Sequence, residues 1–150
     1  VGGWPATAMI TYANKEFFNK LPSNLQNVIA KTKVISGHGS TSGEANFIST
    51  DKIYLLSAHE IWEDATSNRV SYSDTVYKNT RQLDYYKSKE VTTSNYLNTI
   101  KQYNGSNSEW WLRSGSSGSK NYFLIVKNDG DWTNFDARYA SGFAPAVRIG

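Results

Sequence analysis

Cysteine is absent from the sequence, and only one methionine and three prolines occur in its 150 residues. The chain therefore has no disulfide, no thiolate metal ligand and no cysteine nucleophile. No apolar run approaches the roughly 18 residues of a membrane-spanning helix, so we expect no membrane span. No signal-peptide pattern opens the chain, and it begins with Val1 rather than Met. We therefore expect a mature fragment or a domain of a longer protein.

The sequence also lacks a cluster of basic or of acidic residues. The 16 Lys and Arg residues and 13 Asp and Glu residues give a formal net charge of +3, and they are scattered along the chain. A nucleic-acid-binding surface is usually a basic stripe, so we expect no nucleic-acid partner. The length is that of one domain with its own hydrophobic core.

Catalytic and cofactor motifs are also missing. His59-Glu60 begins like the zinc-protease pattern H-E-x-x-H, but Ile61-Trp62-Glu63 follows, so the second histidine is absent. No phosphate-binding loop, dinucleotide fingerprint or G-x-S-x-G motif occurs. We therefore expect a protein that is not an enzyme and has no cofactor. A hydrolase that uses His59, Glu60 or the loop from Asp129 to Asp136 is a remote alternative.

That loop places side-chain oxygens at alternate positions, as calcium-binding loops do. An EF-hand needs Gly at its sixth position and Glu at its twelfth, where this chain has Asn134 and Ala140. We interpret the segment as a polar hairpin without a metal site, and calcium binding near Asp129–Asp136 stays open.

Aromatic residues, in contrast, are abundant. Five Trp, ten Tyr and six Phe make up 14% of the chain, which is more than a core of this size usually holds. Some of these rings should therefore lie on the surface, where aromatic side chains contribute strongly to binding.

The apolar pattern changes from helical to strand-like along the chain. Apolar residues at helical spacing predict an amphipathic helix over 7–19 and a second one that begins near Pro22. The stripe of that second helix is Leu25, Val28 and Ile29. A buried strand is expected at 52–56, followed by a helical turn that Ser57 caps. A short helix is expected over 81–89, and a turn or helical fragment over 95–100.

The last forty residues read as β-structure. Strands are predicted at 110–114, 122–126 and 142–149, with a turn at Asp129-Gly130. Pro145 indicates that the last strand is an edge strand or is bulged. Two N-terminal helices followed by a small antiparallel sheet with long irregular loops indicate an α+β fold.

The C-terminal motif Trp110-Trp111-Leu112-Arg113-Ser114, then Asp129-Gly130, then 142–149 (GFAPAVRI), resembles the ending of a domain family of uncharacterised function from gut bacteria and their phages. Gly2-Gly3-Trp4 and the run 51–57 also look like this family. Such domains are similar to the C-type-lectin fold of variable proteins that diversity-generating retroelements mutate. The resemblance implies a rigid frame with a diversified ligand-binding face, on a phage tail tip or a bacterial cell surface.

Residues between the fixed motifs have the small, polar and aromatic character that adenine mutagenesis produces, and the same mixture serves antibody loops. We expect the surface over 115–141 to bind a protein or glycan. Its candidate ligand-binding residues are Ser116, Ser119, Asn121, Tyr122, Leu124, Ile125, Lys127, Asp131, Trp132, Asn134, Phe135, Asp136, Arg138, Tyr139 and Ser141. The alternative is a glycan- or cell-wall-binding module of fixed specificity on a bacterial surface protein.

The motif residues themselves should build the frame. We expect Phe123 and Val126 in the core, and the rings of Trp132, Phe135 and Tyr139 at the surface. Trp110 and Trp111 should point to opposite faces of one strand. Arg113 should donate hydrogen bonds that brace a loop or a carboxylate.

Overall fold

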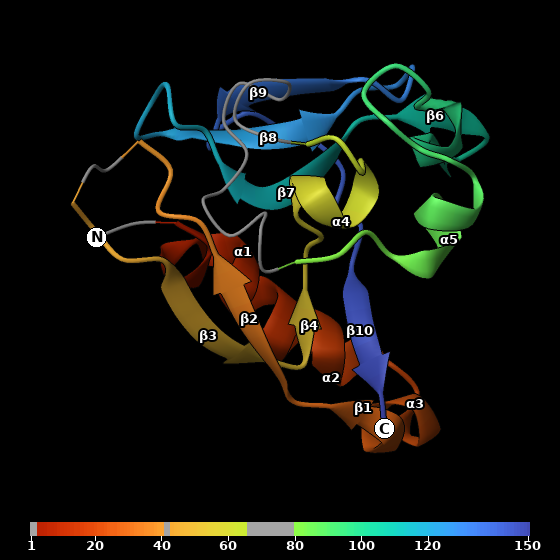
Figure 1. Ribbon diagram of the computed structural model, residues 1–150. Helices are drawn as coiled ribbons and strands as arrows, with labels where there is room; N and C mark the ends of the chain where they lie inside the picture. The colour runs from red at the N-terminus through yellow and green to blue at the C-terminus, as the bar shows by residue number, and fades with distance from the viewer. Residues whose placement is uncertain (1–2, 41–42, 66–79) are drawn as a thin grey trace.

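The computed structural model describes residues 3–40, 43–65 and 80–150. It is a mixed α+β structure in which short helical segments surround small antiparallel sheets (Figure 1). This agrees with the expected class. Within the described ranges, no helix is long and apolar enough to cross a membrane.

The N-terminal helical region runs almost without interruption to residue 20. It comprises η1 (Trp4–Ala6), α1 (Ala8–Thr11), the π-helical η2 (Tyr12–Phe17) and α2 (Phe18–Lys20). Thr7 caps α1 by accepting a hydrogen bond from the Ile10 amide at 3.3 Å. The helix expected over 7–19 is therefore present, although a π segment widens its middle.

Asn14, within that π segment, joins the helical region to the strand that follows 52. Its Oδ1 accepts hydrogen bonds from the amides of Lys52 and Ile53, at 2.8 and 3.0 Å, and its Nδ2 donates to the Ile53 carbonyl at 2.8 Å. These bonds pair the buried backbone polar groups beside β4 (Ile53–Tyr54), which is too short to pair them all in a ladder.

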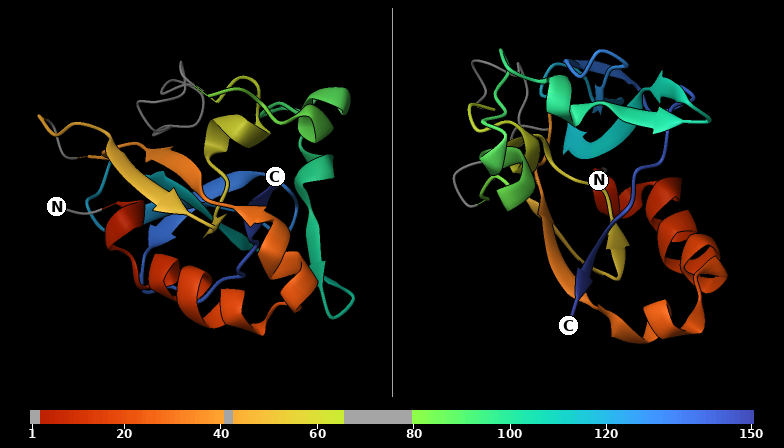
Figure 2. Two further views of the ribbon diagram at one scale, coloured as in Figure 1. Left: turned by 90° about the horizontal axis from the view of Figure 1, so that it is seen from below. Right: turned by 90° about the vertical axis from the view of Figure 1, so that its right-hand side faces the viewer.

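The second expected helix is α3 (Ser23–Val28), which follows Pro22. It ends before Ile29, because Ile29 starts β1 (Ile29–Ala30) and pairs with Ile149 of β10 (Ala146–Ile149). The other end of β10 pairs with β4 through Val147 and Ile53. The last strand therefore lies between β1 and β4, in the order β1-β10-β4. Figure 2 shows the N-terminal helical segments in a row along one side of the molecule.

The expected strand over 142–149 is shorter than predicted. Pairing begins at Ala146, directly after Pro145, so Pro145 is neither an edge nor a bulge residue of β10. Gly142 instead crosses β7 closely, with its amide donating to the Glu109 carbonyl at 2.9 Å. A Cβ at Gly142 would lie 2.6 Å from that carbonyl oxygen, so only glycine fits.

The remaining short elements complete the fold. The Ser57 turn is α4 (Ala58–Ile61), and the helices expected over 81–89 and 95–100 are α5 (Asp84–Ser88) and η4 (Leu97–Thr99). Two two-stranded sheets are made by β2 (Thr32–Ser36) with β3 (Phe47–Asp51) and by β5 (Lys101–Tyr103) with β6 (Ser106–Ser108).

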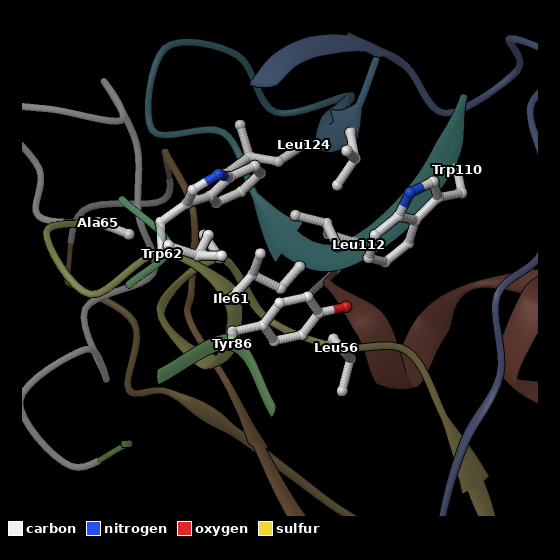
Figure 3. Packing of buried hydrophobic residues seen from close by; sticks show 11 residues of the cluster. Leu56, Ile61, Trp62, Ala65, Tyr86, Trp110, Leu112 and Leu124 are labelled. Carbon is white, nitrogen blue, oxygen red and sulfur yellow. The ribbon is translucent and has the colours of Figure 1, made fainter. Parts of the chain in front are cut away.

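The sheet of β7 (Trp110–Gly115), β8 (Tyr122–Val126) and β9 (Trp132–Asp136) is covered on both faces. One face carries Leu112 and Leu124, which pack with Trp62 of the loop after α4 (Figure 3). The other face carries Trp111 and Ile125, which pack with Trp4, Val34 and Leu55. The rings of Trp110 and Trp111 are therefore buried on opposite faces, as expected. A sheet covered on both sides is a stiff support for whatever its ends carry.

Candidate functional site

A surface cavity of about 660 Å³ lies at the end of this sheet where β8 begins and β9 ends. Its wall on one side is the N-terminal segment from Gly3 to Met9, and on the other side it is the backbone around Asn121 and Ala137. We call it the Trp111 hollow. Its volume lies within the roughly 300–1,000 Å³ range of ligand-binding pockets.

The floor of the Trp111 hollow is apolar. Trp111 and Phe123 contribute from the central sheet, and Met9 contributes from α1. Trp4, whose indole nitrogen donates to Asp51 at 2.9 Å, and Leu55 also line it. These side chains belong to the core, so the floor is held in place by packing on its far side.

The rim is polar and more exposed. It is formed by Lys120, Asn121, Asp136 and Arg138, with Thr7 on the opposite wall. Three of these five, namely Asn121, Asp136 and Arg138, are among the residues expected to bind ligand. A hydrogen bond of 2.8 Å from the Ala137 amide to the Asn121 carbonyl joins the two loops that carry them.

Asp136 and Arg138 form a planar pair on the rim. Arg138 Nε donates to Asp136 Oδ1 and Nη2 donates to Oδ2, both at 2.9 Å, and the Arg138 amide also donates to Oδ1. The guanidinium lowers the pKa of the Asp136 carboxyl to about 2, and the carboxylate in turn raises the pKa of Arg138. Both side chains therefore stay ionised at all ordinary pH values, and their charges cancel.

Beside this pair, Tyr139 and Phe135 stack. Their ring centroids lie 4.3 Å apart at an angle of 18°. Tyr139 is 43% exposed and its hydroxyl donates to Glu109 at 3.2 Å, an interaction that raises the pKa of the phenol. Phe135 is half-buried because its other side packs on the core of the Trp111 face. The expectation of exposure is thus right for Tyr139 and only half right for Phe135.

A second, much smaller cavity of about 30 Å³ adjoins the same loop. It is lined by Ser116, Ser119 and Tyr122 and by the Gly37–Ser40 loop. Tyr122 is 38% exposed there. Among the residues that the structure describes, the buried Nδ1 atom of His38 and Oγ atom of Ser40 have no hydrogen-bond partner. The space is large enough for about one water molecule.

Lys127, Asp131 and Trp132 lie at the opposite end of the β8–β9 hairpin. Lys127 forms ion pairs with Asp129 at 3.2 Å and Asp131 at 3.3 Å, and hydrogen bonds to these carboxylates, to Asp129 above all, raise its pKa. Trp132 is half-buried against the core that contains Trp62. Strand β8 rises over four residues, from Tyr122 to Val126, between the Trp111 hollow and this end. That rise corresponds to roughly 13 Å. The predicted 115–141 surface is therefore divided into two parts.

Three of the predicted ligand-binding residues, Leu124, Ile125 and Ser116, are buried. Leu124 and Ile125 have no exposed surface, because each lies on a covered face of the central sheet. Ser116 is 2% exposed, and its hydroxyl accepts a hydrogen bond from the Gly118 amide. Asn134 and Ser141 are half-buried and line neither cavity. The core positions of Val126 and, in part, Phe123 are confirmed.

The residues considered for catalysis have structural partners. Glu60 accepts hydrogen bonds from the Ser57 amide and the Arg113 guanidinium, and His59 Nδ1 lies 3.0 Å from Thr80 Oγ1. In the described part of the chain, no group of three or more His, Asp or Glu residues is placed to hold a metal ion.

The structure adds residues to the site that sequence reasoning missed. Thr7 and Met9 reach it from the N-terminal helix, and nothing in their local pattern indicates a surface role. Lys120 lies between two predicted ligand-binding residues, Ser119 and Asn121. Its position between them is the feature of the sequence that could have indicated a place in the site. The complete rim required the tertiary structure.

The chain belongs to a family described as a domain of unknown function, DUF6273, whose model matches residues 1–149. No curated protein matches the chain. No solved structure matches it either.

Proposed function

We propose that this member of the DUF6273 family is a ligand-binding domain without enzymatic activity, whose contact surface surrounds the Trp111 hollow. One observation carries the proposal: an apolar floor, held by the core, opens between exposed polar side chains at the end of a sheet buried on both faces. A preformed hollow of this kind binds without a large cost of ordering. The ligand is a protein or a glycan.

We propose further that the fold is C-type-lectin-like and that the domain is a variable protein of a diversity-generating retroelement. Pairing of the first strand with the last, together with N-terminal helices and a three-stranded sheet that carries the loops, supports such a frame. Display on a bacterial cell surface or a phage tail tip follows from the same proposal. Diversification would have to spare the buried codons 124 and 125 and act on exposed ones such as those of Asn121, Arg138 and Tyr139.

The binding proposal is tested with variants that fill the hollow. Ala137 is exposed on the rim, so Ala137→Trp places a large ring over the floor and removes no core atoms. The matched control is Asn107→Trp, which adds the same ring at an exposed position on β6 outside the hollow. Fluorescently labelled domain is titrated onto a panel of intact bacterial cells and onto a glycan array. We expect Ala137→Trp to weaken binding at least about tenfold and Asn107→Trp to leave it unchanged.

Equal binding by both variants would place the contact surface elsewhere.

The retroelement proposal has a separate test, which is the DNA downstream of the gene. We expect a near-copy of the last coding stretch, differing mainly at adenines, beside a reverse-transcriptase gene. Related loci that are identical over the exposed rim codons would instead favour the module of fixed specificity.

The hydrolase alternative would use His59, Glu60 or the loop from Asp129 to Asp136. The side chains of His59 and Glu60 are both engaged, and Glu60 is paired with Arg113, whose side chain is 3% exposed. Turnover of any tested ester or glycoside that His59→Ala abolishes, with folding intact, would favour that alternative.

A further inference from the structure

The chemistry of the Trp111 hollow distinguishes between the two ligand classes left open above. A sugar ring is covered with hydroxyl groups, and each one that is buried needs a hydrogen-bond partner. The hydrogen-bonding side chains of Lys120, Asn121, Asp136 and Arg138 stand on the rim and not on the floor. On the opposite wall, Thr7 carries the one hydroxyl that lines the hollow among the described residues. It is already used, because it donates to the Trp4 carbonyl at 2.9 Å and accepts from the Ile10 amide. The floor therefore favours an apolar group that needs no such partner.

The charge on the rim is positive and unbalanced. The charges of Asp136 and Arg138 cancel in their own bidentate pair. Lys120, in contrast, is exposed, and within the described ranges it has no ion-pair partner. One cation without a counter-charge thus stands beside an apolar cavity. A ligand that matches both features carries an anion next to an apolar group.

Two exposed aromatic side chains lie near the hollow. Tyr139, which follows the Asp136–Arg138 pair and stacks on Phe135, is 43% exposed. Tyr122, between the lining residues Asn121 and Phe123, is 38% exposed on the Leu124 face of β8. Aromatic rings around a central pocket, with charges at the periphery, are typical of the surfaces through which proteins recognise proteins.

From these observations we infer that the ligand is a protein segment that inserts an aromatic side chain into the Trp111 hollow and places a neighbouring Asp or Glu carboxylate against Lys120. The inference rests on the proposed function and narrows it. The indole or phenyl ring would contact Trp111, Phe123 and Met9, and the carboxylate would remain at the rim.

Blocked dipeptides test this inference. The probes are N-acetyl-Trp-Asp-amide, N-acetyl-Trp-Lys-amide and N-acetyl-Ala-Asp-amide, with lactose as the sugar probe. Binding to the ¹⁵N-labelled chain is followed through the amide shifts of Met9, Asn121 and Ala137. We expect Trp-Asp to shift these amides with millimolar affinity, Trp-Lys to bind about three- to tenfold more weakly, and Ala-Asp to cause no shift up to about 10 mM.

Charge reversal supplies the matched variants. Lys120→Glu should invert the preference, so that Trp-Lys binds more tightly than Trp-Asp. Lys89→Glu makes the same change in net charge at an exposed position outside the hollow and should leave the preference unaltered.

Several results would overturn the inference. They are equal binding of Trp-Asp and Trp-Lys, stronger shifts at the same amides with lactose, or no shift with Trp-Asp up to about 10 mM. If any of these occurs while Ala137→Trp still abolishes binding to cells or glycans, the proposed function stands and the ligand class is wrong. If Ala137→Trp has no effect on binding either, the proposed function fails as well.

Discussion

Arg113 and Glu60 form a buried bidentate ion pair that joins the central sheet to α4. Arg113 Nη1 lies 2.6 Å from Glu60 Oε2, and Nη2 lies 3.1 Å from Oε1. Nη1 also donates to the Leu55 carbonyl at 2.8 Å, and Glu60 accepts from the Ser57 amide at 2.8 Å. The pair fixes the loop between β4 and α4 against β7, next to Leu55 of the hollow floor. The expectation that Arg113 braces a loop or a carboxylate is confirmed, and Arg113 contacts both.

Glu60→Gln leaves the buried guanidinium without its counter-charge. We expect the free energy of unfolding to fall by about 3–5 kcal/mol, measured by urea denaturation. The control is Arg81→Met, which removes the exposed pair between Arg81 and Asp84 and should leave the free energy of unfolding almost unchanged. Equal effects of the two variants would show that the Arg113–Glu60 pair does not hold the loop.

Leu124 and Tyr122 lie two residues apart on β8, on one face of the strand but with opposite exposure. Leu124→Ala should lower the free energy of unfolding by about 2–5 kcal/mol, because Leu124 is fully buried and a cavity would remain. Tyr122→Ala should change it by no more than about 1 kcal/mol, because the ring is exposed at the end of the strand. Thermal and urea unfolding of both variants measure this. If Leu124→Ala left the free energy of unfolding unchanged, Leu124 would not be a core residue.

The Asp136 carboxyl should titrate well below its usual range. Since folding lowers its pKa from the ordinary 3.8 to about 2, its contribution to stability is complete above roughly pH 4 and is lost as the pH falls through 2. Carboxyl-carbon NMR should give a midpoint near 2, and Arg138→Gln should raise it toward the ordinary value. Arg81→Gln should leave Asp136 unchanged and raise only the pKa of Asp84, which Arg81 lowers. A midpoint near 4 in the unaltered chain would mean that the rim pair does not form in solution.

At alkaline pH, Tyr86 should destabilise the fold. Burial against the Trp62 core raises the pKa of its phenol to about 12. Because the folded state holds this proton more tightly than the unfolded state, stability is present below pH 10 and is lost as the pH rises from about 10 to 12, by at most about 3 kcal/mol. Tyr86→Phe should flatten this part of the pH dependence, and Tyr103→Phe, at a 72% exposed position, should not. Identical curves for the two variants would contradict the assignment.

Local patterns predicted the helices after residue 7 and the strands near β4, β7, β8 and β10. They did not predict β1, β2, β3, β5, β6 and β9. Strand β8 was expected over 122–126 and is found there, because β-branched and aromatic residues bounded by Ser, Lys and Asn favour an extended chain. The opposite directions of Trp110 and Trp111 follow from the geometry of any strand. The ends of α3 and β10 were predicted less well, because Ile29 and Ala146 are placed by pairing with strands far away in the sequence.

The sequence by itself determined the class of fold, strand β8 with the turn that follows it, and the enrichment of adaptable polar and aromatic residues near them, since periodicity and composition are local properties. Only the tertiary structure decided which of those residues face solvent. Leu124 and Ile125 are both buried because the sheet is covered on two faces, and a short apolar run cannot reveal how many layers will cover it. The Trp111 hollow likewise exists because the segment around Thr7 and Met9 packs beside Asn121 and Ala137. Contacts between such distant segments arise when the whole chain buries its apolar surface, and they leave no local signal in the sequence.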